Sequence, residues 1–127
     1  MLVGTAAASA ASTGWKAVKQ GNGQAEAKFV GYKKWYSRND HHGGFRIKGQ
    51  LKDLKNNDRA VKFQIKVVGY SPKVYNAPED ANRTIPDRIH HDPAMTITPC
   101  ARIQTCERNV GPDDCSAWRK YSNPYYD

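Results

Sequence analysis

Apolar and polar residues alternate strictly along two neighbouring stretches of the chain, 45–52 and 61–67. In both stretches every second residue is apolar, apart from Gly49, and the residues between them are Lys, Arg or Gln. Successive side chains of a strand point to opposite faces, so this period predicts two strands that each bury one face. The polar turn sequence between them predicts that the two strands pair as an antiparallel hairpin.

The predicted hairpin brings basic side chains from both strands to one solvent-facing surface. Like charges opposite each other across a sheet are mildly destabilising, so this pattern indicates an anionic partner. The alternative is a surface that only keeps the domain soluble, with long Lys side chains splayed into water. The predicted basic surface consists of Arg46, Lys48, Lys52, Lys62 and Lys66.

The size of the chain allows one domain with a single modest core, since it has 127 residues of which 39% are hydrophobic. Ten Gly, seven Pro and seven Tyr favour short strands and turns over helices. Residues 71–94 contain four Pro and show no period, which predicts a long functional or mobile loop, and a strand pattern resumes at Met95. We expect an all-β fold, a small antiparallel β-sandwich over residues 14–127, with no transmembrane segment.

The net charge of +8 is unevenly distributed along the chain. Residues 28–75 hold twelve basic and three acidic residues, whereas residues 76–127 hold six basic and eight acidic ones. A local excess of this kind attracts polyanions. The expected partner is therefore an anionic polymer, with nucleic acid among the candidates, or an acidic protein.

Three aromatic residues, Tyr32, Trp35 and Tyr36, lie among the basic residues Lys33 and Lys34. This mixture is typical of surfaces that stack on bases or sugars while holding an anionic backbone. Stacking requires exposed rings, and in a small domain the alternative is that most Trp and Tyr belong to the core.

Residues 1–13 are rich in Ala, carry no charge, and include the sequence Ala-Ser-Ala at 8–10. A small-x-small triplet of this kind is typical of a signal-peptide cleavage site, which predicts a secreted protein. A basic region ahead of it is missing from the sequence, so the alternative is a disordered leader.

The three cysteines, Cys100, Cys106 and Cys115, favour one pairing. If 100–106 is a strand, the first two sulfurs lie about 20 Å apart, which is too far for a disulfide. The sequence between Cys106 and Cys115 contains Gly-Pro-Asp-Asp and can turn the chain back, so we predict a disulfide hairpin there. Cys100 is then a buried thiol or a link to another chain, and a fully reduced trio is the alternative.

Two His-His pairs, at 41–42 and 90–91, are the remaining candidates for chemistry. If their loops meet at one end of the sheet, one His from each pair could bind a divalent metal with Asp40, Asp87 or Asp92. The same residues, His41, His42, His90 and His91, could act as general acid and base in a ribonuclease. The simpler interpretation is solvated loop histidines, because the spacing matches no known ligand motif.

The stretch GFRIKGQLKDLKNNDRAVKFQIKVVGY, followed later by RIQTCERNVGPDDCSAW, resembles a pattern in small secreted β proteins of Streptomyces and related actinobacteria. In that pattern a Phe-Arg strand, an Asn/Asp turn and a long alternating strand precede a C-terminal cysteine hairpin. The resemblance covers residues 40–120 and implies a secreted β protein of largely uncharacterised function. It transfers no catalytic residue, and the third cysteine and the His-His pairs depart from it.

From these features we predict a secreted, non-catalytic binding protein that uses a basic sheet face and the 71–94 loop. The expected ligand is an anionic polymer or a partner protein, within an extracellular assembly, and no cofactor is expected. The alternative function is a small secreted ribonuclease or toxin that uses the loop histidines.

Overall fold

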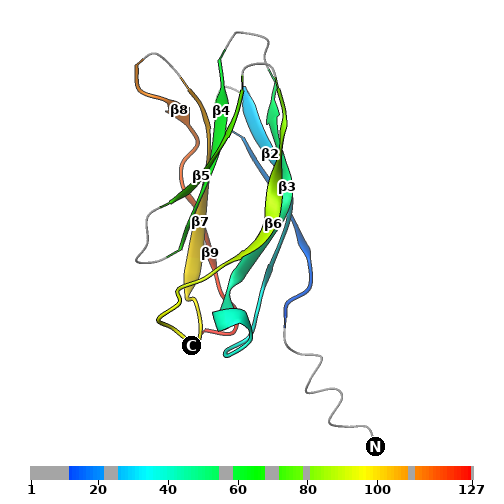
Figure 1. Ribbon diagram of the computed structural model, residues 1–127, viewed down its shortest axis with the longest axis vertical. Helices are drawn as coiled ribbons and strands as arrows, with labels where there is room; N and C mark the ends of the chain where they lie inside the picture. Colours follow the sequence, from blue (N-terminus) through cyan, green and yellow to red (C-terminus); the bar gives the residue numbers. More distant parts are fainter. Residues whose placement is uncertain are drawn as a thin grey trace, which may run out of the picture.

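The computed structural model describes residues 12–21, 26–54, 59–67, 72–78, 81–108 and 111–126. These residues form two antiparallel sheets that face each other, as Figure 1 shows. Within them we find no helix that is long and apolar enough to cross a membrane. The strands are β1 (Lys16–Gly21), β2 (Ala27–Trp35), β3 (Phe45–Asp53), β4 (Val61–Val67), β5 (Lys73–Ala77), β6 (Arg83–His90), β7 (Cys100–Glu107), β8 (Asp114–Cys115) and β9 (Arg119–Ser122), with a short 3₁₀ turn η2 (His41–Gly43) before β3.

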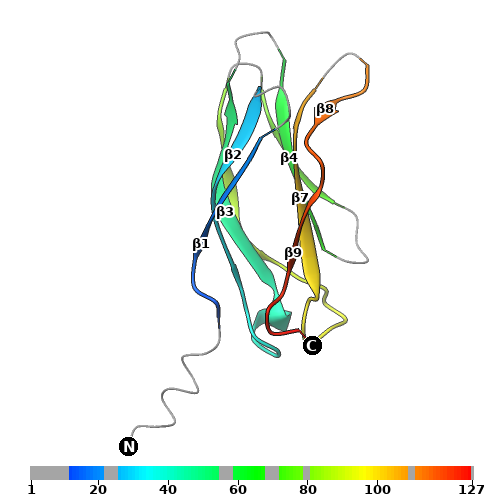
Figure 2. The same cartoon turned by 180° about the vertical axis from the view of Figure 1, so that it is seen from behind.

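The strand order defines the two layers. Sheet 1 has the order β1-β2-β3-β6, and sheet 2 has the order β5-β4-β7, with β8 and β9 both pairing with the far side of β7. Strands β5 and β6 lie along one edge of the sandwich, and β1 and β9 lie along the other (Figures 1 and 2). The predicted all-β sandwich is confirmed.

The core lies between the two sheets and consists of the apolar side chains that occupy every second position of the strands. Phe29 of β2 stacks on Phe63 of β4, with ring centroids 4.1 Å apart, and this contact joins the two layers. Ile47 and Leu51 of β3 and Ile103 of β7 are fully buried around it. Burying one such side chain contributes about 1.5–3 kcal/mol, so these alternating strands supply much of the driving force for folding.

The predicted hairpin between the two alternating stretches is wrong, although both stretches are strands. Strand β3 pairs with β2 and β6, whereas β4 pairs with β5 and β7, so the two lie in different sheets. Two strands that each bury one face show the same alternation whether they pair side by side in one sheet or face each other across the core from two sheets. The alternation therefore identifies the buried faces and leaves the pairing partner open.

The expected long loop at 71–94 is also wrong, because it contains β5 and β6. Both are edge strands, and Pro86 lies in β6 where the register with β3 shifts between Ile47 and Gly49. A proline cannot donate a ladder hydrogen bond, so an edge with an irregular register accommodates it. The strand expected from Met95 begins later, at Cys100, directly after Pro99.

The cysteine assignment is confirmed, since Cys106 and Cys115 form a disulfide that joins β7 to β8. Cys100 is a free and buried thiol.

The buried side-chain amide of Gln20 also links the two sheets, because it lies on β1 of sheet 1 and contacts β7 of sheet 2. Gln20 of β1 donates to the carbonyl oxygen of Ile103 at 3.1 Å and accepts from the Thr105 hydroxyl at 2.9 Å.

Candidate functional site: a basic and aromatic face of sheet 1

The outer face of sheet 1 carries a dense set of basic side chains. In the register of β2 and β3, Lys28 is opposite Lys52 and Lys34 is opposite Arg46. Lys48 lies between them on the same side, opposite Tyr32. In β1 Val18 and Gln20 are buried, so Lys19 between them points to the same outer face. We call this surface the basic face, and it consists of Lys19, Lys28, Lys34, Arg46, Lys48 and Lys52.

Of the five basic residues predicted to share one surface, the structure brings together only Arg46, Lys48 and Lys52. Lys62 and Lys66 lie on the outer face of sheet 2, on the opposite side of the sandwich. The prediction of a single surface is wrong because it depended on the β3–β4 pairing. Lys62 also forms an ion pair with Asp113, at 2.6 Å.

Trp15 is the aromatic residue of this face that the sequence analysis missed, and Lys19 and Lys28 are cations that it missed. Trp15 is 36% exposed, and its ring lies among three cations. Lys48 Nζ is 4.3 Å from the ring centroid, Lys34 Nζ is 4.7 Å, and the Arg46 guanidinium carbon is 5.1 Å. Each such contact is worth about 0.5–1 kcal/mol at an exposed site. The signal was present in the sequence, because Trp15 lies two residues before Ala17, the first outward-facing residue of β1, and therefore on the same face.

The three aromatic residues predicted for stacking divide between surface and core. Tyr32 is 52% exposed on the basic face. Trp35 and Tyr36 are buried, at 2% and 7% exposure, so the prediction that they offer stacking surfaces is wrong. Trp35 is three residues after Tyr32 on β2, so it points to the opposite face, toward the core. There it packs on Phe45, with ring centroids 4.9 Å apart.

Arg46 is held in one position by two side chains, Asp87 of β6 and Tyr36, which follows β2 directly. Its Nε and one Nη donate to the two carboxylate oxygens of Asp87 on β6, both at 2.7 Å, and its other Nη donates to the Tyr36 hydroxyl at 3.0 Å. These hydrogen bonds lower the pKa of Asp87 and raise that of Arg46, so both stay charged. Asp87 is the one acidic residue within the four strands of sheet 1 that lies on this face.

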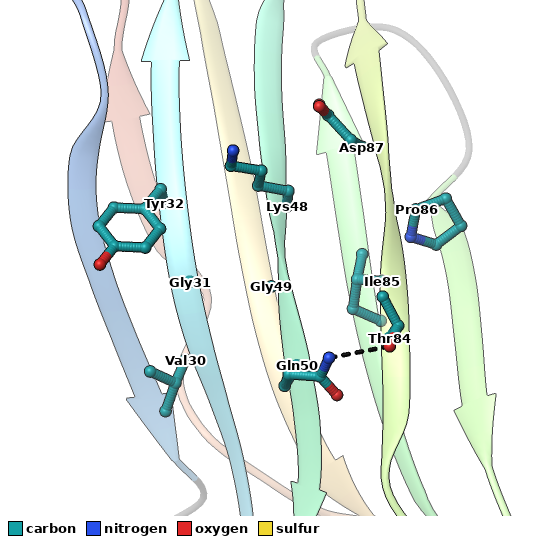
Figure 3. Close-up of a pocket in the computed structure, with 10 residues that line it drawn as sticks. All are labelled: Val30, Gly31, Tyr32, Lys48, Gly49, Gln50, Thr84, Ile85, Pro86 and Asp87. Atoms are coloured by element: carbon teal, nitrogen blue, oxygen red, sulfur yellow. Dashed lines mark hydrogen bonds between the residues drawn. The ribbon is translucent and has the colours of Figure 1, made fainter.

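A hollow of about 410 Å³ lies beside this ion pair (Figure 3). Tyr32 and Pro86 supply apolar walls, and Lys48 and Asp87 lie at one end. At the other end the Gln50 amide donates to the Thr84 hydroxyl at 2.8 Å. Apolar walls with a few fixed polar groups are typical of sites that bind one ring-sized unit of a ligand.

The backbone beside the hollow depends on two glycines, Gly31 and Gly49, which are register partners on β2 and β3. A Cβ atom on Gly31 would lie 2.0 Å from the carbonyl oxygen of Lys48. One on Gly49 would lie 2.3 Å from the carbonyl oxygen of Val30. Only glycine allows the strands to come this close, so the pair fixes the position of Lys48 beside Tyr32.

The two His-His pairs do meet at one end of the sandwich. The rings of His42 and His91 are stacked in parallel with centroids 4.5 Å apart, and His42 Nδ1 lies 2.9 Å from the Met95 carbonyl oxygen. Stacked rings at this separation leave no room for a phosphate between them. Among the described residues we find no group of three or more ligating side chains that could hold a metal.

His90 differs from the other histidines because it is largely buried. Burial, and then the neighbouring charges of Arg88, Lys73 and His91, lower the pKa of His90 to about 4. The ring is therefore neutral at pH 7, and its Nε2 is buried without a hydrogen-bond partner in the described part of the chain. A ring in this state offers no proton for general acid catalysis at neutral pH.

Comparison of this chain with protein-family models, curated proteins and solved structures finds no match in any of the three.

Proposed function

We propose that this protein is a secreted, non-catalytic binding module whose basic face holds an anionic polymer. The observation that supports this most strongly is the β2–β3 register, which sets Lys28 against Lys52 and Lys34 against Arg46. Opposite charges at these positions would stabilise the sheet, and like charges oppose it. Asp87 already offsets part of this cost at Lys34 and Arg46, and a polyanion lying across the two strands would lower the remaining repulsion at both pairs.

The aromatic side chains on the same face favour a polymer built of ring-shaped units. Tyr32 offers an exposed ring beside the hollow, and Lys48 stands next to it. A sugar or base could stack on Tyr32 while its anionic group contacts Lys48, as in proteins that bind single-stranded polyanions. The ion pair between Arg46 and Asp87 holds the Arg46 guanidinium in place before the ligand arrives, which lowers the ordering cost of binding.

Secretion is part of this proposal, and the disulfide between Cys106 and Cys115 agrees with an oxidising compartment. The resemblance to small secreted actinobacterial proteins points in the same direction. An extracellular site would expose the protein to anionic polymers of the cell envelope and to free nucleic acid.

The test is a titration of the full chain with three probes of matched charge: heparin oligosaccharides, oligothymidylate and polyphosphate. We expect all three to bind with an affinity that falls steeply as salt is added. The two probes with rings should bind more tightly than polyphosphate, because only they can stack on Tyr32. No binding of any probe at low salt would overturn the proposal.

Two charge reversals provide the matched comparison. Lys48→Glu places a negative charge on the basic face, whereas Lys73→Glu makes the same change on the edge strand β5. We expect Lys48→Glu to weaken binding at least about tenfold, which corresponds to about 1.4 kcal/mol. Lys73→Glu should change it by less than about threefold. Equal losses in both variants would mean that only net charge matters.

A further inference from the structure

The basic residues do not end at the margin of sheet 1. At the edge where β1 lies beside β9, the register sets Lys16 opposite Lys33, and both side chains are on the side that faces sheet 2. Arg119 of β9 reaches them from the other sheet and donates to the Lys19 carbonyl oxygen at 3.2 Å. We call Lys16, Lys33 and Arg119 the edge cluster.

Two cations of the edge cluster, Lys33 and Arg119, lie over the same aromatic ring. Lys33 Nζ is 4.6 Å from the centroid of the Tyr121 ring, and the Arg119 guanidinium carbon is 5.2 Å from it. None of the three cations forms an ion pair with a carboxylate in the described ranges of the chain. Partial burial, Arg119 and Lys16 all lower the pKa of Lys33, so a bound anion would stabilise its charged form.

A third group of cations continues the path onto sheet 2. In the register of this sheet Lys66 of β4 is opposite Arg102 of β7, and Arg102 is opposite Lys120 of β9. These three residues, the back row, lie side by side on the outer face, and Arg102 and Lys120 are exposed. Lys120 follows Arg119 directly in the chain, so the back row begins where the edge cluster ends.

We propose that the basic face, the edge cluster and the back row form one continuous belt, so that a single flexible polyanion wraps around the β1–β9 edge and contacts both sheets. Figure 2 shows β1 and β9 together on this side of the sandwich. The inference rests on the proposed function and makes it more specific, because it requires a ligand longer than one sheet face. Strand and sheet spacings give a path of about 30 Å from β3 around the edge to β4.

The test is a length series of oligothymidylates, some shorter and some longer than the ~30 Å path. Short probes can use only the basic face, whereas long probes can also reach the back row. We expect the affinity of the wild-type protein to rise at least about tenfold once the probe spans the path, because the second contact becomes intramolecular.

The discriminating variant is Arg102→Gln combined with Lys120→Gln, which removes two exposed charges of the back row. We expect it to keep wild-type affinity for short probes and to lose most of the gain for long ones. The matched control is Lys73→Gln combined with Arg88→Gln, two exposed cations on β5 and β6 at the other edge, and it should keep that gain. Equal behaviour of the two double variants would overturn the belt.

A second measurement does not depend on those variants. Long probes should raise the pKa of Lys33, followed by NMR of its side chain, and short probes should leave it unchanged. If short probes bind but long probes bind no tighter and leave Lys33 unaffected, the belt is wrong and the proposed function stands. If probes of no length bind, the proposed function itself is wrong.

Discussion

Three residues in and just before the η2 turn show that one end of the sandwich carries local backbone strain. Asn39, His41 and His42 all have positive φ values, between 51° and 67°. A left-handed backbone costs a residue with a side chain roughly 1–2 kcal/mol, so tertiary contacts must hold the turn. The backbone N–H of Asn39 donates to the Thr96 carbonyl oxygen at 2.8 Å, and the side-chain Nδ2 of Asn123 donates to the Gly43 carbonyl oxygen at 3.0 Å.

His90 gives this end of the molecule a pH dependence. An unfolded His titrates near pH 6.5, whereas the pKa of His90 in the folded protein is about 4. Between these values the unfolded chain binds more protons, so the free energy of unfolding falls as the pH falls from about 6.5 to about 4. We expect a loss on the order of 2–3 kcal/mol, measured by urea unfolding at a series of pH values.

The control for this prediction is His90→Gln, which should flatten the curve within that window, next to His41→Gln at an exposed position, which should not. The ion pair between Asp87 and Arg46 does not contribute there. The pKa of Asp87 is lowered, so its stabilisation is lost only below pH 4, when the carboxylate is protonated. A wild-type curve that is flat between pH 6.5 and 4 would contradict the buried position of His90.

At the scale of the strands, the contact between β2 and β3 decides the geometry of the candidate site. These strands meet at the glycine pair Gly31 and Gly49, and the side chains that line the hollow flank that pair. A one-residue slip of either strand would turn its own outward side chain, Tyr32 of β2 or Lys48 of β3, toward the core. The close approach of the two backbones therefore ties sheet stability and the binding surface to the same residues.

We predict that Gly31→Ala destabilises the protein by about 2–3 kcal/mol or prevents folding, since the added methyl carbon would lie 2.0 Å from the Lys48 carbonyl oxygen. Gly111→Ala is the matched control, because a Cβ atom there meets nothing within 4 Å. It should change stability by less than about 1 kcal/mol. The measurement is the urea midpoint of both variants, and comparable losses would show that the close approach is not rigid.

At the scale of the whole molecule, both sheets have basic outer faces and share one apolar core. The core joins them through Phe29 and Phe63, and Gln20 of β1 joins the two sheets near the β1–β9 edge. The buried hydrogen bonds of Gln20 hold β1 against β7 near this edge, and Arg119 is held by its hydrogen bond to the Lys19 carbonyl oxygen. The belt therefore needs little rearrangement to bind.

The disulfide acts on the whole chain through the unfolded state. Cys106 and Cys115 are separated by nine positions, and closing a loop of that size should stabilise the protein by about 2–3 kcal/mol. We expect the double variant Cys106→Ala, Cys115→Ala to lose this amount in urea unfolding. Cys100 should react with a thiol reagent only after unfolding, at one thiol per chain without reductant, and three reactive thiols would contradict the bridge.

Local sequence was enough to predict that residues 45–52 and 61–67 form strands, which of their side chains are buried, and which cysteines pair. Each of these depends on local information, because the period of a strand and the reach of a short loop are fixed by backbone geometry. The alternation at 45–52 and 61–67 therefore identified the core positions of β3 and β4 correctly. The edge strands β5 and β6 carry no such period, which is why they were missed.

Tertiary packing decides which strands are neighbours, and therefore which charges share a surface. The contact that places Lys48 beside Tyr32 and Trp15 joins residues far apart in the chain, as does the one that places Lys33 beside Arg119. Apolar burial is non-directional, so β3 and β4 can bury the same side chains as a hairpin or across the core. The packing of all the strands together places β3 and β4 in different sheets. Lys62 and Lys66 therefore lie on the side of the sandwich opposite to Arg46 and Lys48.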